Sequence, residues 1–169
     1  MIKFRPSLLA LVLLAAVSTG FAQAHKKKSG GAPMHATHVM ITPDEVKWGP
    51  APPSLPPGFE MAVLRGDPGK AGGQFAIRAR FPDGYRVPPH WHPTDENVVV
   101  IQGTFLIGLG EKFDEAAMRE MPAGSYLLMP QRARHFAMAR GETIIQVYGI
   151  GPFAVNYVNA ADDPRHKPK

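Results

Sequence analysis

The chain has 169 residues, no cysteine and a formal net charge of +5, and 44% of its residues are hydrophobic. This length suits one domain, and a chain without cysteine depends on its core rather than on disulfides for stability. No segment interleaves aromatic with basic residues as single-strand nucleic-acid grooves do, so we do not expect nucleic acid as a partner.

Residues 1–24 are predicted to be a secretory signal peptide. Lys3 and Arg5 precede an apolar run from Leu8 to Val17, and Ala22-Gln23-Ala24 provides a small-residue cleavage pattern. The apolar run is about ten residues long, against roughly 20 for a membrane-spanning helix. We therefore expect an exported protein, periplasmic or secreted, with no integral membrane segment after processing. An uncleaved membrane anchor is the alternative, because both kinds of segment depend on the same apolar run.

The rest of the chain divides into three parts. Residues 25–36 contain Lys26-Lys27-Lys28 followed by small residues, a composition typical of a flexible basic linker. Residues 37–160 are predicted to form the folded domain, and residues 161–169 a polar C-terminal tail.

The predicted domain is all-β. Short apolar or alternating runs are separated by turn residues, and the chain has 17 glycines and 18 prolines. The predicted strands are Phe59–Arg65, Gln74–Phe81, Arg86–Trp91, Asn97–Gln102, Thr104–Gly110, Ser125–Met129, His135–Arg140, Thr143–Ile150 and Phe153–Val158. Apolar and polar residues alternate over Gln74–Phe81, which indicates a sheet with one apolar face.

Two segments do not fit the strand pattern. Phe113–Glu120 contains helix formers without glycine or proline, so a helix of about two turns is predicted there. Gly49–Gly58 is rich in proline, which lacks the backbone donor that a central strand needs. We expect this segment to be an ordered arm or a polyproline-like connector on the barrel.

Three side chains suggest a metal site. His90 and His92 are two residues apart on an extended segment, so both imidazoles leave the same face. Glu96 follows after a proline-containing bend that can return its carboxylate to them. Two imidazoles and a carboxylate suit a divalent Fe, Mn, Co, Ni, Cu or Zn ion. Such a site needs a further ligand from elsewhere in the chain.

The same segment resembles the first motif of the cupin superfamily, G-x5-H-x-H-x3/4-E-x6-G. Gly84, His90, His92, Glu96 and Gly103 occupy its positions. The resemblance implies a single double-stranded β-helix, or jelly-roll, barrel that binds one divalent transition metal ion. It also implies a homodimer, because cupin barrels commonly pair.

The second cupin motif, G-x5-P-x-G-x2-H-x3-N, is matched in part. Gly124, Pro130 and His135 occupy its positions, so the resemblance implies that His135 is the fourth metal ligand. Arg132 stands where the family has glycine, and Ala139 where it has asparagine. These departures call into question a local turn and a strand-end contact.

The ends of the domain narrow the resemblance. Thr37-His38-Val39-Met40 and Asn156-Tyr157-Val158-Asn159 resemble small exported cupins related to the cupin domains of anti-sigma factors. The alternative to a metal site is a set of hydrogen-bonded barrel histidines, or a cupin that has lost its metal. His35 and His38 lack a matching carboxylate and are expected at the surface.

Two further residues are candidates for catalysis. In Thr143–Tyr148, alternation puts Ile144, Gln146 and Tyr148 on one face. If that face is the lumen, Gln146 could orient a ligand and Tyr148 could move a proton. If it is not, both are outward-facing strand residues.

The predicted function is that of a metal-dependent cupin. Val98 and Val100 would share the inward face of Glu96, giving a mostly apolar lumen with a small polar floor. The hypothesis is a mononuclear metalloenzyme of dioxygenase or isomerase type that acts on a small organic molecule. The alternative is a non-catalytic sensor cupin that binds metal or a small ligand.

Overall fold

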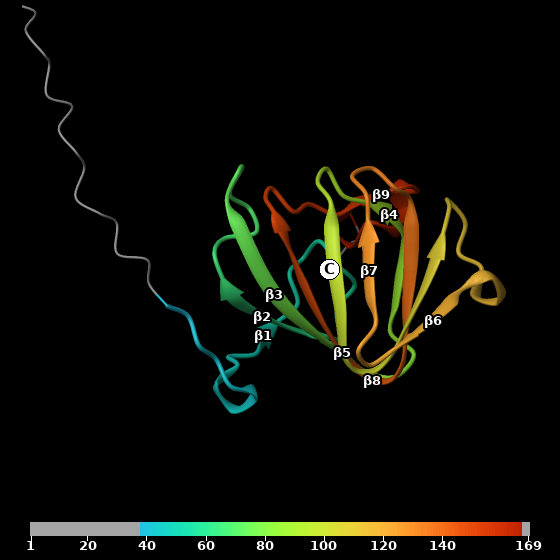
Figure 1. Ribbon diagram of the computed structural model, residues 1–169. Helices are drawn as coiled ribbons and strands as arrows, with labels where there is room; N and C mark the ends of the chain where they lie inside the picture. Colours follow the sequence, from blue (N-terminus) through green and yellow to red (C-terminus); the bar gives the residue numbers. More distant parts are fainter. Residues whose placement is uncertain (1–37, 167–169) are drawn as a thin grey trace, which may run out of the picture. The chain divides into compact units, whose positions relative to one another are not determined.

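The computed structural model describes residues 38–166, so the predicted signal peptide and basic linker lie outside the described residues. The strands are β1 (Gly49–Pro50), β2 (Glu60–Arg65), β3 (Gln74–Phe81), β4 (Arg86–Trp91), β5 (Glu96–Leu109), β6 (Arg119–Pro122), β7 (Tyr126–Met129), β8 (His135–Ile150) and β9 (Asn156–Tyr157) (Figure 1). Four single turns of 3-10 helix are η1 (Pro43–Glu45), η2 (Glu115–Ala117), η3 (Ala160–Asp162) and η4 (Pro164–His166). The described part of the chain contains no α-helix, and none of its helical turns is long and apolar enough to cross a membrane. The prediction of an all-β fold is confirmed.

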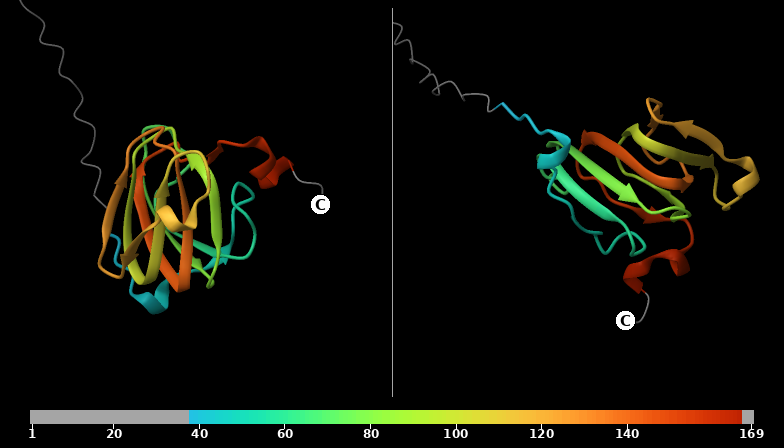
Figure 2. Two further views of the ribbon diagram at one scale, coloured as in Figure 1. Left: turned by 90° about the vertical axis from the view of Figure 1, so that its right-hand side faces the viewer. Right: turned by 90° about the horizontal axis from the view of Figure 1, so that it is seen from below.

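All strand pairs are antiparallel, and β5 and β8 are the centre of the sheet. β8 pairs with β3 through its C-terminal half and with β4 through its N-terminal end, while β5 runs beside β8 along almost its whole length. β5 also pairs with β6 and β7, and β4 with β9. The two long strands bend, so the sheet curls around an interior (Figures 1 and 2).

The bends occur at glycines between segments that were predicted as separate strands. Asn97–Gln102 and Thr104–Gly110 belong to one strand, β5, whose register with β8 shifts around Gly103. Gly103 has a φ of 74°, and a Cβ atom there would lie 2.4 Å from the carbonyl oxygen of Glu142. A glycine bulge of this kind allows a strand to turn the corner of a barrel without ending.

The predicted helix over Phe113–Glu120 is wrong. Only Glu115–Ala117 forms a single 3-10 turn, and the chain then enters β6, where Glu120 pairs with Leu106 of β5. A helix of two turns has little stability of its own, and the segment instead completes hydrogen bonds along the edge of β5.

The prediction of a proline-rich arm is confirmed. Gly49 and Pro50 pair with the start of β2 at the edge of the sheet, where proline is tolerated. Residues 51–58, called the strap below, then cross the barrel, and Leu55 packs against the core. Two phenols hold the strap: Tyr85 donates to the carbonyl of Pro56, and Tyr157 donates to that of Ser54 at 2.9 Å.

The interior is filled by the apolar face that alternation predicts. Phe75, Ile77, Ala79 and Phe81 of β3 are all buried, and they belong to one continuous core cluster. At the other end of the domain η3 and η4 pack back on the chain, because Arg165 pairs with Asp163 and donates to the carbonyl of Val155 at 3.1 Å. The predicted tail boundary at residue 160 falls at the start of η3.

Candidate metal centre

A bulge in β4 directs His90 inward. The register of β4 against β8 shifts between Val87 and His90, where two prolines supply the extra length. Because of this shift, Val87 and His90 both line the same interior cavity although three positions separate them. His92 follows directly after the strand, and the side chains of His90 and His92 are both buried.

The other two residues come from strand starts that lie beside this segment. His135 is the first residue of β8 and pairs directly with His90 across the strands. Glu96 is the first residue of β5, and its Oε2 lies 3.3 Å from Nε2 of His135 and 3.5 Å from Nε2 of His92. The structure therefore brings together all four side chains that the sequence proposes as metal ligands.

Hydrogen bonds to the backbone set the tautomer of each imidazole. Nδ1 lies 2.8 Å from the Pro88 carbonyl in His90, 2.9 Å from the Ala154 carbonyl in His92, and 2.9 Å from the Ala133 carbonyl in His135. A carbonyl oxygen only accepts, so each Nδ1 carries a proton, and in the neutral form of each ring Nε2 presents a lone pair. This is the arrangement by which proteins orient histidine ligands toward a metal.

The donor set fits a divalent transition ion. One ring nitrogen from each of the three histidines lies within 4.8 Å of the others, a spacing at which they could hold one ion. Nε2 of His92 is buried and has no hydrogen-bond partner among the described residues. Lone pairs and a carboxylate that face one another with no donor between them are unfavourable unless a cation or a proton joins them. The site thus has the composition and the orphaned acceptor that a mixed N/O metal centre needs.

The pKa values of His90 and Glu96 are both shifted toward the forms that bind a metal. Burial, together with the neighbouring His135 and His92, lowers the pKa of His90 to about 3, so this imidazole is neutral near pH 7. Burial alone would raise the pKa of the Glu96 carboxyl, but the adjacent His92 and His135 outweigh it and hold that pKa well below its usual range. Neutral imidazole and ionised carboxylate are the forms that bind a cation.

The space next to the four side chains is a cavity of about 60 Å³ with apolar walls. Its walls include Phe59 and Phe81 from one side of the barrel, Ile107 from β5, and Leu55 from the strap. Phe153 also lines it and stacks on the His92 imidazole, with ring centroids 4.3 Å apart and planes 21° apart. Sequence reasoning did not select Phe153 or Leu55, since neither belongs to a motif and each contacts the site only through the tertiary fold.

The two departures from the second motif leave the geometry intact. Arg132 has a φ of 63°, so it adopts the left-handed conformation for which glycine is usual, and its N–H donates to the His92 carbonyl at 2.8 Å. Ala139 is buried, donates to the Tyr85 carbonyl and accepts from the Gly84 N–H, both at 2.9 Å. Backbone groups alone make these contacts, so neither glycine nor asparagine is required.

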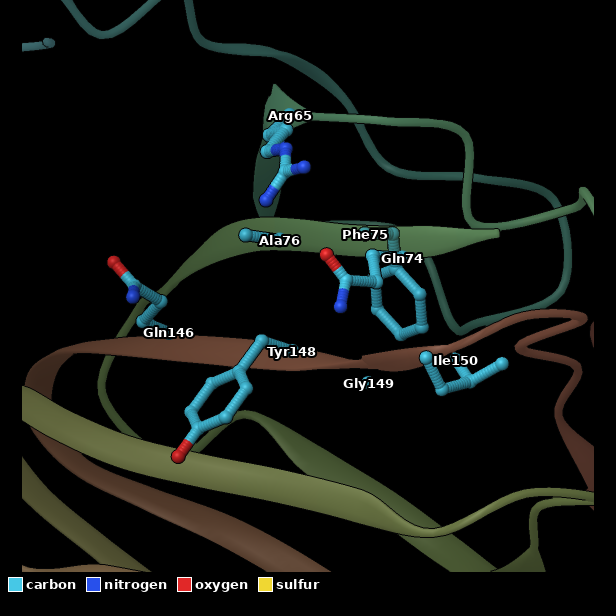
Figure 3. A pocket seen from close by; sticks show the side chains of 8 residues that line it. All are labelled: Arg65, Gln74, Phe75, Ala76, Gln146, Tyr148, Gly149 and Ile150. Atoms are coloured by element: carbon cyan, nitrogen blue, oxygen red, sulfur yellow. The ribbon is translucent and has the colours of Figure 1, made fainter. Parts of the chain in front are cut away.

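Gln146 and Tyr148 lie on the opposite face of β8 from the cavity. Ile145 and Val147 point inward and line it, whereas Gln146 and Tyr148 line a separate outer groove of about 440 Å³ together with Arg65 and others (Figure 3). Gln146 accepts a hydrogen bond from Arg78 at 3.2 Å, on the same outer surface. Of the two faces that the sequence left open, Gln146 and Tyr148 thus lie on the outward one, because the odd-numbered residues of β8 point inward.

Val98 and Val100 are buried on the same side of β5 as Glu96, as alternation predicts. They belong to the core cluster and do not line the cavity themselves.

Both the geometry and the comparison with known proteins identify the class of protein. A curled antiparallel barrel with three histidines and a glutamate at the starts and ends of its strands defines a cupin. Residues 36–154 match the model of the ChrR cupin-like domain, which covers more than half of the chain. The chain belongs to this family, which relates it to the cupin domains of anti-sigma factors. No curated protein matches the chain significantly in sequence.

Several solved structures share the fold. The polyketide cyclase RemF from Streptomyces resistomycificus is 18% identical with a TM-score of 0.60, and the alignment covers 76% of this chain and 91% of that one. A putative acetylacetone dioxygenase from Methylibium petroleiphilum PM1 is 18% identical with a TM-score of 0.58, covering 76% and 86%. KdgF from Halomonas sp. is 21% identical with a TM-score of 0.51, covering 68% and 96%. At these identities the likeness establishes the jelly-roll fold.

Proposed function

We propose that this protein is a mononuclear metalloenzyme that acts on a small organic molecule, with His90, His92, Glu96 and His135 as the metal ligands. The observation that carries the proposal is Nε2 of His92, which is buried, has no hydrogen-bond partner among residues 38–166, and faces a carboxylate in a set of imidazoles oriented by backbone carbonyls. Such a set is useful for binding a cation and costly without one.

The chain supplies orientation and a dry, enclosed space for the reaction. A divalent ion held by these four side chains would supply Lewis-acid chemistry, and redox chemistry if it is Fe, Mn, Co, Ni or Cu. Glu96 offsets the charge of the ion, and the backbone carbonyls hold the imidazoles in place. The aromatic side chains of Phe153 and Phe81 exclude water from the same space.

Between the two enzyme types, the cavity favours the dioxygenase. An isomerase needs a side chain that moves a proton beside the metal, and among the described residues no acidic, basic or hydroxyl side chain other than the four ligands lines the cavity. The candidate Tyr148 lies on the outer face. Of the structural neighbours, one is named a putative acetylacetone dioxygenase and another a polyketide cyclase, and both names concern small oxygen-bearing molecules.

A non-catalytic sensor is the second candidate, because the family takes its name from a cupin-like domain related to those of anti-sigma factors. Metal analysis of natively produced protein, followed by oxygen consumption with diketones, catechols and thiols, distinguishes the two. We expect a bound transition ion and metal-dependent oxygen uptake with at least one substrate class, abolished in the His90→Ala, His135→Ala variant. Metal binding without turnover of any class would favour the sensor. Absence of metal would contradict the metalloenzyme and leave only a sensor that binds a small ligand.

A further inference from the structure

The composition of the cavity restricts what can bind beside the metal. Its volume of about 60 Å³ is well below the roughly 300–1,000 Å³ of pockets for drug-sized ligands. Among the described residues that line it, the polar side chains are the four proposed ligands, and every other lining side chain is apolar.

Within this cavity, a polar group of a bound molecule can be satisfied only at the metal ion. Oxygen atoms directed at the ion are satisfied there, whereas a charged or strongly polar group elsewhere on the molecule would face Phe81, Phe105 or Ile107 without a donor or acceptor. Burying an uncompensated charge in this way costs far more than apolar contact returns.

We propose that the site binds a compact, largely apolar molecule that reaches the metal through one or two oxygen atoms and bears no charge elsewhere, and that Leu55 limits its size. The inference rests on the proposed function, since the metal must bind the only polar part of the molecule. It adds the chemical class of the ligand and a residue that determines its size.

Leu55 is suited to this role by its position in the chain. It lines the cavity from the strap, which is not part of the curled sheet, whereas Ile77, Ile107 and Ile145 line it from the strands. Tyr85 and Tyr157 hold the strap in place through the carbonyls of Pro56 and Ser54. Burial, and then the nearby Asp163, raises the pKa of Tyr157 to about 12, so this phenol remains a donor. Truncating Leu55 therefore enlarges the cavity without altering a strand.

The charge rule can be tested with two chelators that share one metal-binding head. Protein loaded with Co(II) is titrated with butyrohydroxamic acid and with β-alanine hydroxamic acid, whose tails have equal length and end in a methyl and an ammonium group. The visible absorption of Co(II) reports binding, and Co(II) in buffer gives the intrinsic preference of the ion. We expect the ammonium compound to bind at least about 100-fold more weakly to the protein after that correction.

The outcomes separate this inference from the proposed function. Equal binding of the two chelators, or binding of neither to protein that carries one Co(II) per chain, overturns the inference and leaves the metal centre in place. Failure to load Co(II) at all removes the metal centre, and the inference with it.

The size rule needs a variant pair. Benzohydroxamic acid carries the same head with a wider tail, and we expect Leu55→Ala to bind it at least about tenfold more tightly than the unaltered protein. Leu128→Ala is the matched control, because Leu128 lies on β7, is 44% exposed and does not line the cavity. No gain in Leu55→Ala, or the same gain in both variants, would show that Leu55 does not limit the size of the ligand.

Discussion

His90 and His135 are direct cross-strand neighbours on β4 and β8, and their ring centroids lie 4.2 Å apart. Each of these imidazoles donates its Nδ1–H to a backbone carbonyl, which leaves its Nε2 available to bind a metal ion. The pairing of two strands far apart in the sequence thus creates half of the proposed metal centre.

Glu96 is the only carboxylate that lines the cavity among the described residues. Glu96→Gln keeps the shape and one oxygen donor but removes the negative charge that offsets the ion. We expect the affinity for a divalent transition ion to fall at least about 100-fold, measured by competition with a chelator of known affinity. Glu120→Gln, an exposed residue paired with Arg140, is the control and should leave the affinity unchanged. Unchanged affinity in Glu96→Gln would remove the carboxylate from the ligand set.

The metal-free protein should lose stability in acid. The pKa of His90 is about 3 in the folded protein and about 6.5 when unfolded, so the unfolded chain takes up the proton first as the pH falls. Stability from this group is present above about pH 6.5 and declines toward pH 3, with a slope that approaches about 1.4 kcal/mol per pH unit. The depressed pKa of Glu96 acts in the same direction below its usual range. Denaturant melts at several pH values measure the slope, and a His90→Gln variant should show a shallower one.

Gly103 and Gly84 provide a matched test of the barrel corner. Both have a positive φ, 74° and 72°, but a Cβ at Gly103 would overlap the carbonyl of Glu142, whereas at Gly84 nothing lies within 4 Å. Alanine at Gly84 should cost only the backbone strain, about 1–2 kcal/mol. Alanine at Gly103 should cost at least about 1 kcal/mol more, because the bend between β5 and β8 must open. Equal losses in thermal unfolding would mean that the close approach at Gly103 is not rigid.

We expect the protein to be a homodimer. Val39, Met40 and Ile41 are consecutive exposed apolar residues before the barrel, and Met40 is 88% exposed. Exposed apolar segments of this kind are usually covered in an assembly. Sedimentation at micromolar concentration should give twice the mass of one chain, and changing all three residues to serine should give monomers. A monomeric mass for the unaltered protein would contradict the prediction of a homodimer.

Much of the fold follows from patterns that the sequence displays directly. The alternation in Gln74–Phe81 predicts β3 and its buried face without error, and the prolines of the strap exclude it from the interior of the sheet. The four proposed ligands are likewise read from motif spacing, because imidazole and carboxylate at these positions leave few alternatives.

Other features depend on the three-dimensional fold. Alternation groups Gln146 with Tyr148 but does not say which face of β8 is inward, so the sequence left that choice open. The helix predicted at Phe113–Glu120 does not form, because part of the segment pairs with the edge of β5 instead. Local helix propensity contains no information about such tertiary pairing. The sequence shows that Arg132 replaces the family's glycine, but not that Arg132 adopts the left-handed conformation itself, which the turn that holds the His92 carbonyl requires.

The most direct test of the central claim is the metal content of the His90→Ala, His135→Ala double variant. The unaltered protein should carry close to one divalent transition ion per chain by elemental analysis, and the double variant should carry none, because two of the four ligands are gone. A His35→Ala, His38→Ala variant is the control and should keep the full content. If the double variant at His90 and His135 retains one ion per chain while the control loses it, the ion binds elsewhere and the metal centre described above is contradicted.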